Sequence, residues 1–159
     1  MNRLALLPFV ILMAACAEPD PNLPGRASVI DGDTLELRQQ RIRLWGVDAP
    51  EGRQTCRVDS QEVRCGQVAA NRLDQYIDGR PVTCFAQDED RYGRVVARCE
   101  VAGVDLGGWL VREGLAVRYA RYAGTAYLIE DAQARRARRG LWAGEFETPE
   151  DWRRARRSR

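Results

Sequence analysis

The feature that most constrains the fold is the segment 26–50, RASVIDGDTLELRQQRIRLWGVDAP, in which apolar and polar residues alternate. Alternation with a period of two is typical of a strand that buries one face. Asp31-Gly32 interrupts this pattern, and Asp-Gly is a common dipeptide of tight hairpin turns. The segment therefore predicts two or three short strands, the first two joined by a hairpin.

Strand and helix patterns are interleaved in the rest of the chain. Residues 80–87 and 94–101 have strand patterns on either side of the turn DEDRYG, whereas 52–65 has the composition of a polar loop. Apolar stripes predict helices over 66–77, 105–113 and 126–139, which Gly79, Gly114 and Gly140 would end. Together these elements predict an α+β domain whose five short strands form a small closed barrel.

The first 17 residues have the features of an export signal. Arg3 supplies a positive charge, and the apolar stretch 4–15 is too short to span a bilayer. LMAAC resembles a lipoprotein box with Cys16 as the lipidated residue, while ACA also fits an ordinary signal with cleavage after Ala17. Both alternatives predict export, to the periplasm, to the envelope through a lipid anchor, or by secretion.

Three parts follow the signal: a proline-rich tether at 18–25, a globular domain at 26–146 and a basic tail at 147–159. We expect the tail to be dispensable for chemistry. Its arginines either add affinity for polyanions or are simply solvated.

Cysteine usage supports export. Apart from Cys16 there are four cysteines, and an even number in an exported chain indicates two disulfides rather than a zinc site, since no C-x-x-C spacing occurs. Four cysteines allow three connectivities. A turn centred between Arg91 and Tyr92 would place Cys84 opposite Cys99 in an antiparallel pair, which leaves Cys56 to pair with Cys65.

The amino-acid composition limits the kinds of catalytic site that the chain can form. All 25 basic residues are arginine, a pattern that suits phosphate binding and is also typical of GC-rich genomes. Histidine is absent, which excludes Ser-His and Cys-His nucleophiles, histidine bases and the common zinc hydrolase sites. Catalysis must therefore use carboxylates, arginine, tyrosine, cysteine or a metal bound through oxygen.

Carboxylates and arginines concentrate in the first strands. Asp33 follows the predicted turn and Asp48 ends a strand; the pair could hold Ca²⁺ or could simply stabilise turns. Arg43 lies within a strand pattern, where its guanidinium needs a partner. It could form a structural salt bridge or, together with Arg94, clamp a phosphate whose charge rises in the transition state.

Five motifs in order resemble the signatures of the staphylococcal nuclease (thermonuclease) family: VIDGDTLEL, RIRLWGVDAPE, DRYGRVVARC, LVREGLA and ARRARRGLWAG. The resemblance spans about residues 26–146. It implies an OB-fold barrel with three helices and Ca²⁺-dependent hydrolysis of DNA and RNA.

The resemblance also implies roles for individual residues. Those expected at the metal are Asp33, Asp48, the backbone carbonyl of Ala49 and, through water, Asp31. Glu51 is implied as the general base, with Arg43 and Arg94 as the phosphate-clamping arginines. No histidine is needed for this chemistry.

Substrate contacts are less well defined by the motifs. Arg91 and Tyr92 in the predicted turn are candidates, and Tyr92 could stack on a base or cover the barrel rim. Tyr119 and Tyr122 are both candidates for a later tyrosine of the family. Ala49 replaces a threonine found in well-known members, and a disulfide-closed loop replaces the family's loop after Glu51.

Two other functions remain compatible with such a chain. OB barrels also bind single strands without chemistry, and an envelope lipoprotein can be purely structural. The presence of both aspartates, both arginines and the glutamate favours catalysis. The sequence thus predicts a nuclease, most simply a monomer, that takes DNA or RNA as substrate.

Overall fold

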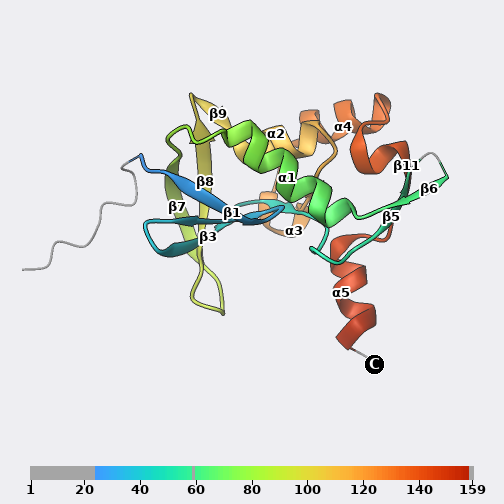
Figure 1. The fold of residues 1–159 in the computed structure, drawn as a ribbon, viewed down its shortest axis with the longest axis horizontal. Coiled ribbons are helices and arrows are strands. Elements are labelled where there is room, and N and C mark those ends of the chain that lie inside the picture. Colours follow the sequence, from blue (N-terminus) through green and yellow to red (C-terminus); the bar gives the residue numbers. More distant parts are fainter. Residues whose placement is uncertain (1–23, 59, 158–159) are drawn as a thin grey trace, which may run out of the picture.

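A curled sheet forms the centre of the structure, a computed structural model that describes residues 24–58 and 60–157 (Figure 1). Its strands run in the order β1 (Ala27–Asp31), β2 (Thr34–Leu37), β3 (Gln40–Leu44), β8 (Val95–Val101) and β7 (Thr83–Glu89), and β9 (Val104–Asp105) also pairs with β8. Neighbours are antiparallel except β3 and β8, which are parallel. Hydrogen bonds between Gly25 and Val82 bring together the chain before β1 and the chain before β7, so the outer edges of the sheet meet as in a barrel. The predicted α+β barrel fold is confirmed.

The first hairpin forms, but its turn lies one residue later than the predicted Asp31-Gly32. β1 and β2 are joined at Gly32-Asp33, and Asp31 lies opposite Thr34. The next turn depends on Arg38 and Gln39, whose φ values of 53° and 65° lie in the left-handed region. Such angles are uncommon for residues other than glycine, so this turn carries little sequence signal.

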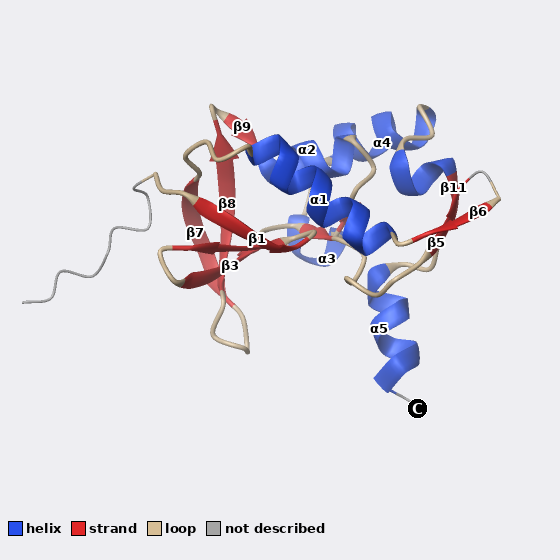
Figure 2. Cartoon of the chain, viewed as in Figure 1, coloured by secondary structure: helices blue, strands red, loops and turns tan. Residues whose placement is uncertain are grey.

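Helices cover one side of the sheet and extend beyond it (Figure 2). They are α1 (Cys65–Ile77), α2 (Leu106–Arg112), α3 (Ala120–Ala123), α4 (Leu128–Arg136), the 3₁₀ turn η1 (Gly140–Ala143) and α5 (Pro149–Arg157). α1 and α2 match their predictions. α4 ends earlier than predicted, because Arg138 adopts a φ of 51° and Gly140 begins η1. The sequence analysis did not predict α3 or α5.

Two smaller sheets complete the described structure. β4 (Val47–Asp48) pairs with β10 (Val117–Arg118). β5 (Cys56–Val58) pairs with both β6 (Gln61–Val63) and β11 (Gly144–Glu145). The prediction of a polar loop at 52–65 was therefore wrong, because part of that segment forms a hairpin.

The core lies between the curled sheet and the helices α1 and α2. Its largest fully buried aliphatic side chains come from these elements and from the segments beside them: Leu35, Leu44, Val47, Leu73, Ile77, Val82, Val101, Leu106, Leu110 and Val111. Burying side chains of this size stabilises the fold by roughly 1.5–3 kcal/mol each. This core fixes the strands whose ends carry the polar residues described below.

Both predicted disulfides are present. Cys84 of β7 lies opposite Cys99 of β8 and is bonded to it, and Cys56 of β5 is bonded to Cys65 at the start of α1. The predicted signal segment, its Cys16 and most of the tether lie outside the described residues. Within 24–58 and 60–157, none of the helices has the length and apolar character needed to cross a bilayer.

Candidate active site

Asp33 and Asp48 are buried at neighbouring strand ends. Asp33 lies in the turn between β1 and β2, and Asp48 is the last residue of β4; their exposed fractions are 4% and 1%. Buried carboxylates need hydrogen-bond donors or a cation. The partners of these two residues therefore define what the site can bind.

Arg43 of β3 joins the two aspartates. Its Nη1 donates to Asp33 Oδ1 at 3.1 Å and its Nη2 donates to Asp48 Oδ1 at 2.9 Å. Burial alone would lower the pKa of Arg43, but the charges of Asp33 and Asp48 raise it on balance. The structure thus contains the salt bridge that the sequence analysis gave as one alternative, and contact with a phosphate stays a prediction.

The Asp33 carboxylate and the Asp33 backbone N–H each form a hydrogen bond with a neighbouring residue. The Ala49 N–H donates to Asp33 Oδ2 at 2.9 Å, and the Asp33 N–H donates to Asp31 Oδ1 at 3.1 Å. Burial raises the pKa of Asp33 to about 7, against the opposing effect of Arg43. Asp31 and Ala49 both lie beside Asp33, and their roles at a metal stay predictions.

Glu51 lies in the loop after β4, where buried Gln54 fixes the backbone. The Glu51 N–H donates to Gln54 Oε1 at 3.2 Å, and the Gln54 N–H donates to the Glu51 carbonyl at 2.7 Å. Gly66 of α1 packs against the same carbonyl so closely that a Cβ atom there would lie 1.9 Å from the oxygen. Sequence reasoning did not identify Gln54 or Gly66 as positioning residues for this loop.

Arg153 of α5 reaches the same acids. Its Nη1 donates to Asp48 Oδ1 at 2.9 Å and to Glu51 Oε1 at 2.8 Å, and its Nη2 donates to Asp48 Oδ2 at 2.9 Å. Burial opposes the charged form, but these hydrogen bonds raise the pKa of Arg153. The sequence analysis placed this residue in a basic tail and missed its contact with the site.

Sequence signals for α5 do exist. Thr148 precedes Pro149, the first helical residue, and its hydroxyl accepts a hydrogen bond from the Asp151 N–H at 3.2 Å. A threonine cap, proline at the first position and acidic residues in the first turn are typical of a helix N-terminus. Gln54 Nε2 also donates to the Glu147 carbonyl at 2.7 Å, which ties the start of α5 to the Glu51 loop.

Arg94 follows the turn between β7 and β8. Its guanidinium is paired with Asp90 at 2.7 Å, and its N–H donates to Asp90 Oδ1 at 3.0 Å. Partial burial of Asp90 tends to raise its pKa, but these hydrogen bonds lower the pKa on balance. Arg94 is thus held at the rim of the barrel, and no direct contact joins it to Asp33, Asp48 or Glu51 within the described residues.

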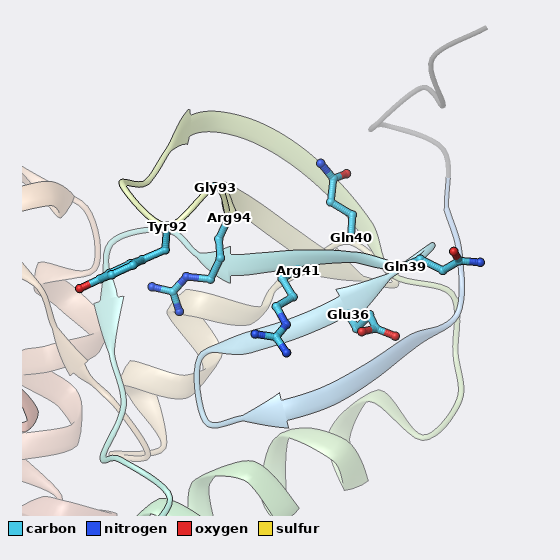
Figure 3. A pocket seen from close by; sticks show the side chains of 7 residues that line it. All are labelled: Glu36, Gln39, Gln40, Arg41, Tyr92, Gly93 and Arg94. Carbon is cyan, nitrogen blue, oxygen red and sulfur yellow. The ribbon is translucent and has the colours of Figure 1, made fainter. Parts of the chain in front are cut away.

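A surface depression of about 630 Å³ lies beside Arg94 (Figure 3). Its lining combines the ends of β2 and β3 with the β7–β8 turn: Glu36, Gln39, Gln40, Arg41, Tyr92, Gly93 and Arg94. The guanidinium groups of Arg41 and Arg94 point to the same side in this view, whereas the Tyr92 ring extends away from them. Arg91 and Arg94 each lie within 6 Å of the Tyr92 ring centroid, at 5.2 and 5.7 Å.

Tyr119, one of the two later candidate tyrosines, is connected through its backbone to the strands of the site. It follows β10, which pairs with β4, and its N–H donates to the Gly46 carbonyl at 2.9 Å. Partial burial raises the pKa of Tyr119, with contributions from the charges of Glu150 and Asp48. Tyr122 packs edge-on against Tyr119 at 4.9 Å between ring centroids and is 56% exposed.

The donor set at the site consists of oxygen atoms. In the described part of the chain, no three side chains of histidine, cysteine, aspartate or glutamate form a complete metal-binding group. Asp33 and Asp48 can therefore supply only part of a coordination shell, with backbone oxygen, water and substrate oxygen for the remainder. Oxygen ligands of this kind suit a hard divalent cation.

Similarity to known proteins agrees with this geometry. A family model described as "Staphylococcal nuclease homologue" matches residues 41–144. The succinoglycan biosynthesis protein ExoI of Rhizobium meliloti (strain 1021) is 38% identical over 138 residues, which cover 84% of this chain and 70% of that protein. An uncharacterized endonuclease of Escherichia coli is 29% identical over 150 residues, 90% of this chain and 92% of its own.

A probable staphylococcal-like nuclease, CAN1 of Oryza sativa subsp. japonica, is 32% identical over 80% of this chain, but the match spans only 36% of the rice protein. The family match covers the strands that carry Arg43 and Asp48, the loop that carries Glu51, and Arg94 just before β8. The chain belongs to the staphylococcal nuclease family, and it is accordingly a hydrolase of phosphodiester bonds.

Proposed function

We propose that this nuclease cleaves DNA and RNA at the cluster formed by Asp33, Asp48 and Glu51, in a reaction that depends on Ca²⁺. The observation that carries the proposal is the bridging position of Arg43, which holds Asp33 and Asp48 within the reach of one guanidinium group. Arg43 supplies one positive charge for these two buried carboxylates, so the pair keeps a net negative charge unless a further cation binds. Such a pair is suited to binding a divalent metal.

Asp33 and Asp48 would hold the ion, with the Ala49 carbonyl as a third ligand and Asp31 acting through water. These are oxygen ligands at an incomplete site, which fits the loose, oxygen-rich shell of Ca²⁺. When bound, Ca²⁺ supplies a positive charge that stabilises the developing charge of the phosphoryl group. The Ala49 N–H already orients the Asp33 carboxylate, and the Asp33 N–H holds the Asp31 carboxylate beside it.

Glu51 acts as the general base. Its side chain is 37% exposed, so water can reach it, and Gln54 keeps its backbone in place. A carboxylate that water can reach is able to accept a proton from the attacking water. Arg43 and Arg94 donate hydrogen bonds to phosphoryl oxygens, and Asp90 positions Arg94.

Substrate binding extends from the site along the barrel rim. On one side, cationic and aromatic contacts for nucleotides come from Arg91 and Tyr92. On the other side, aromatic contacts come from Tyr119 and Tyr122. We further propose that the protein acts as a monomer after export. The N-terminal segment 1–17 supports export, and Cys16 supports a lipid anchor in the envelope.

Incubation of the purified protein with plasmid DNA or with RNA, in Ca²⁺ and in chelator, tests the proposal. Cleavage of both polymers in Ca²⁺ and its loss in chelator are expected. Cleavage that persists in chelator would contradict the metal requirement, and binding without cleavage would favour a nucleic-acid-binding module.

Replacing Ca²⁺ by Mg²⁺ tests the identity of the ion. Mg²⁺ demands a tight octahedral shell and loses its water reluctantly, so we expect much slower cleavage. Equal turnover in the two ions would contradict the assignment of Ca²⁺.

A further inference from the structure

Helix α5 places a positive charge among the acids of the site. Arg153 contacts both carboxylate oxygens of Asp48 at 2.9 Å and Oε1 of Glu51 at 2.8 Å. It therefore meets one residue assigned to the metal and the residue assigned as the base. Asp48 is 1% exposed, so few other groups can approach its carboxylate.

A guanidinium and a divalent ion compete for such oxygens. Arg43 already donates to Asp48 Oδ1, and Arg153 occupies Oδ1 and Oδ2 together. A metal bound to Asp48 would lie within a few ångströms of the Arg153 charge, and like charges at that distance in a partly buried site repel strongly. Binding of the ion therefore requires Arg153 to release at least one Asp48 oxygen.

Hydrogen bonds at the start of α5 keep Arg153 next to Asp48 and Glu51. Gln54 Nε2 donates to the Glu147 carbonyl, and Thr148 caps the first turn of α5. These contacts fix the helix beside the Glu51 loop, which gives Arg153 a high effective concentration at the acids. The family match ends at residue 144, so α5 lies beyond the region that the family model covers.

We propose that Arg153 is an internal counter-cation that competes with the metal ion for Asp48 and Glu51, so that α5 sets the metal concentration at which the nuclease becomes active. This inference rests on the proposed function, because it takes Asp48 as a metal ligand. In the metal-free protein Arg153 neutralises the two acids. On metal binding Arg153 would release these acids, which would leave Glu51 free to accept a proton.

A purely structural salt bridge would behave differently. Its removal would lower the melting temperature without increasing the affinity for a cation. The competing role predicts that loss of Arg153 makes metal binding tighter, a gain that simple loss of structure does not produce.

Calorimetric titration of the full chain with CaCl₂, without nucleic acid, separates these cases. Arg153→Ala should bind Ca²⁺ about tenfold more tightly than the wild type or better, because charge-assisted hydrogen bonds no longer have to be broken. Arg153→Lys should give an intermediate affinity, since lysine keeps the charge but not the two-pronged contact. Arg157→Ala is the matched control: Arg157 is exposed at the end of α5, so this variant loses the same charge without touching the site.

Unchanged or weaker Ca²⁺ affinity in Arg153→Ala, in a protein that melts as a folded domain, would overturn the inference. An equal gain in Arg157→Ala would also overturn it, because general charge would then explain the effect. If the wild type binds Ca²⁺ and cleaves nucleic acid while Arg153→Ala matches its affinity, only this inference fails. If neither protein binds Ca²⁺ or cleaves, the proposed function fails as well.

Discussion

Arg153 donates hydrogen bonds to both carboxylate oxygens of Asp48, a residue 105 positions earlier in the chain. The contact connects α5, the last helix of the described structure, to the end of β4. It makes α5 part of the candidate active site rather than a detached basic tail. That residues 148–159 are dispensable for chemistry stays a prediction, but the tail is not simply solvated, because Arg153 pairs with Asp48 and Glu51.

Ca²⁺ affinity should rise as the pH is raised from about 6 to about 8. Burial raises the pKa of Asp33 to about 7, so below that pH a proton occupies the carboxylate that the metal requires. Above it the carboxylate is ionised and the affinity should level off. Calorimetry at several pH values, in buffers of different ionisation enthalpy, should show proton release on binding. Affinity that does not change over this range would contradict the role of Asp33.

Replacement of Arg43 or Arg94 by lysine should not preserve activity. Arg43 bridges Asp33 and Asp48 with two nitrogen atoms, and lysine has a single ammonium group that cannot reproduce this geometry. Loss of one such donor typically costs about 3–4 kcal/mol in the barrier, or several hundredfold in rate.

Melting temperatures should distinguish the two lysine variants. Arg43→Lys should also destabilise the fold, because Arg43 pairs with two buried acids, whereas Arg94→Lys should melt close to the wild type. Single-turnover rates at saturating Ca²⁺ measure the catalytic effect. A lysine variant that retains the wild-type rate would show that its arginine does not contact the reacting phosphate.

Gly66→Ala should impair the site by displacing the loop that carries Glu51. A Cβ atom at Gly66 would lie 1.9 Å from the Glu51 carbonyl oxygen and 2.9 Å from the Gly52 Cα, so the Glu51 loop must move. We expect a lower melting temperature and a lower cleavage rate at saturating Ca²⁺.

Gly52→Ala provides the control for this variant, since no atom lies within 4 Å of a Cβ atom added there. It lies in the same loop and should leave stability almost unchanged. Wild-type behaviour of Gly66→Ala would mean that the approach between α1 and the Glu51 loop does not position the base.

The sequence predicted the hairpin of β7 and β8 well because local pairing determines it. Cys84 does lie opposite Cys99, although the prediction assumed a regular register. The pairing register shifts between Ala86 and Asp88. The turn is centred on Tyr92, half a residue later than predicted, and the register shift compensates for this difference. A bulge of this kind has no clear sequence signal, so part of the success came from two errors that cancelled.

Long-range contacts explain what the sequence did not predict. The hairpin of β5 and β6 is completed by β11, whose residues pair with β5 residues 86 and 88 positions earlier, and polar residues dominate the hairpin sequence. In the sequence, Arg153 looks the same as the arginines around it. Only the position of α5 in the folded protein brings Arg153 to Asp48 and Glu51. Asp33, Arg43, Asp48 and Glu51 were found because they lie in motifs close together in the chain, whereas buried Gln54 has no such motif.

The substitution Glu51→Gln tests the central claim most directly. It keeps the size of the side chain and an oxygen that can accept a hydrogen bond from Arg153, but it removes the base. Single-turnover cleavage should be measured at saturating Ca²⁺ beside a thermal melt and a Ca²⁺ titration. We expect a folded protein that binds Ca²⁺ and nucleic acid but cleaves about a hundredfold more slowly or worse. A variant that melts normally and cleaves at the wild-type rate would show that Glu51 is not the base.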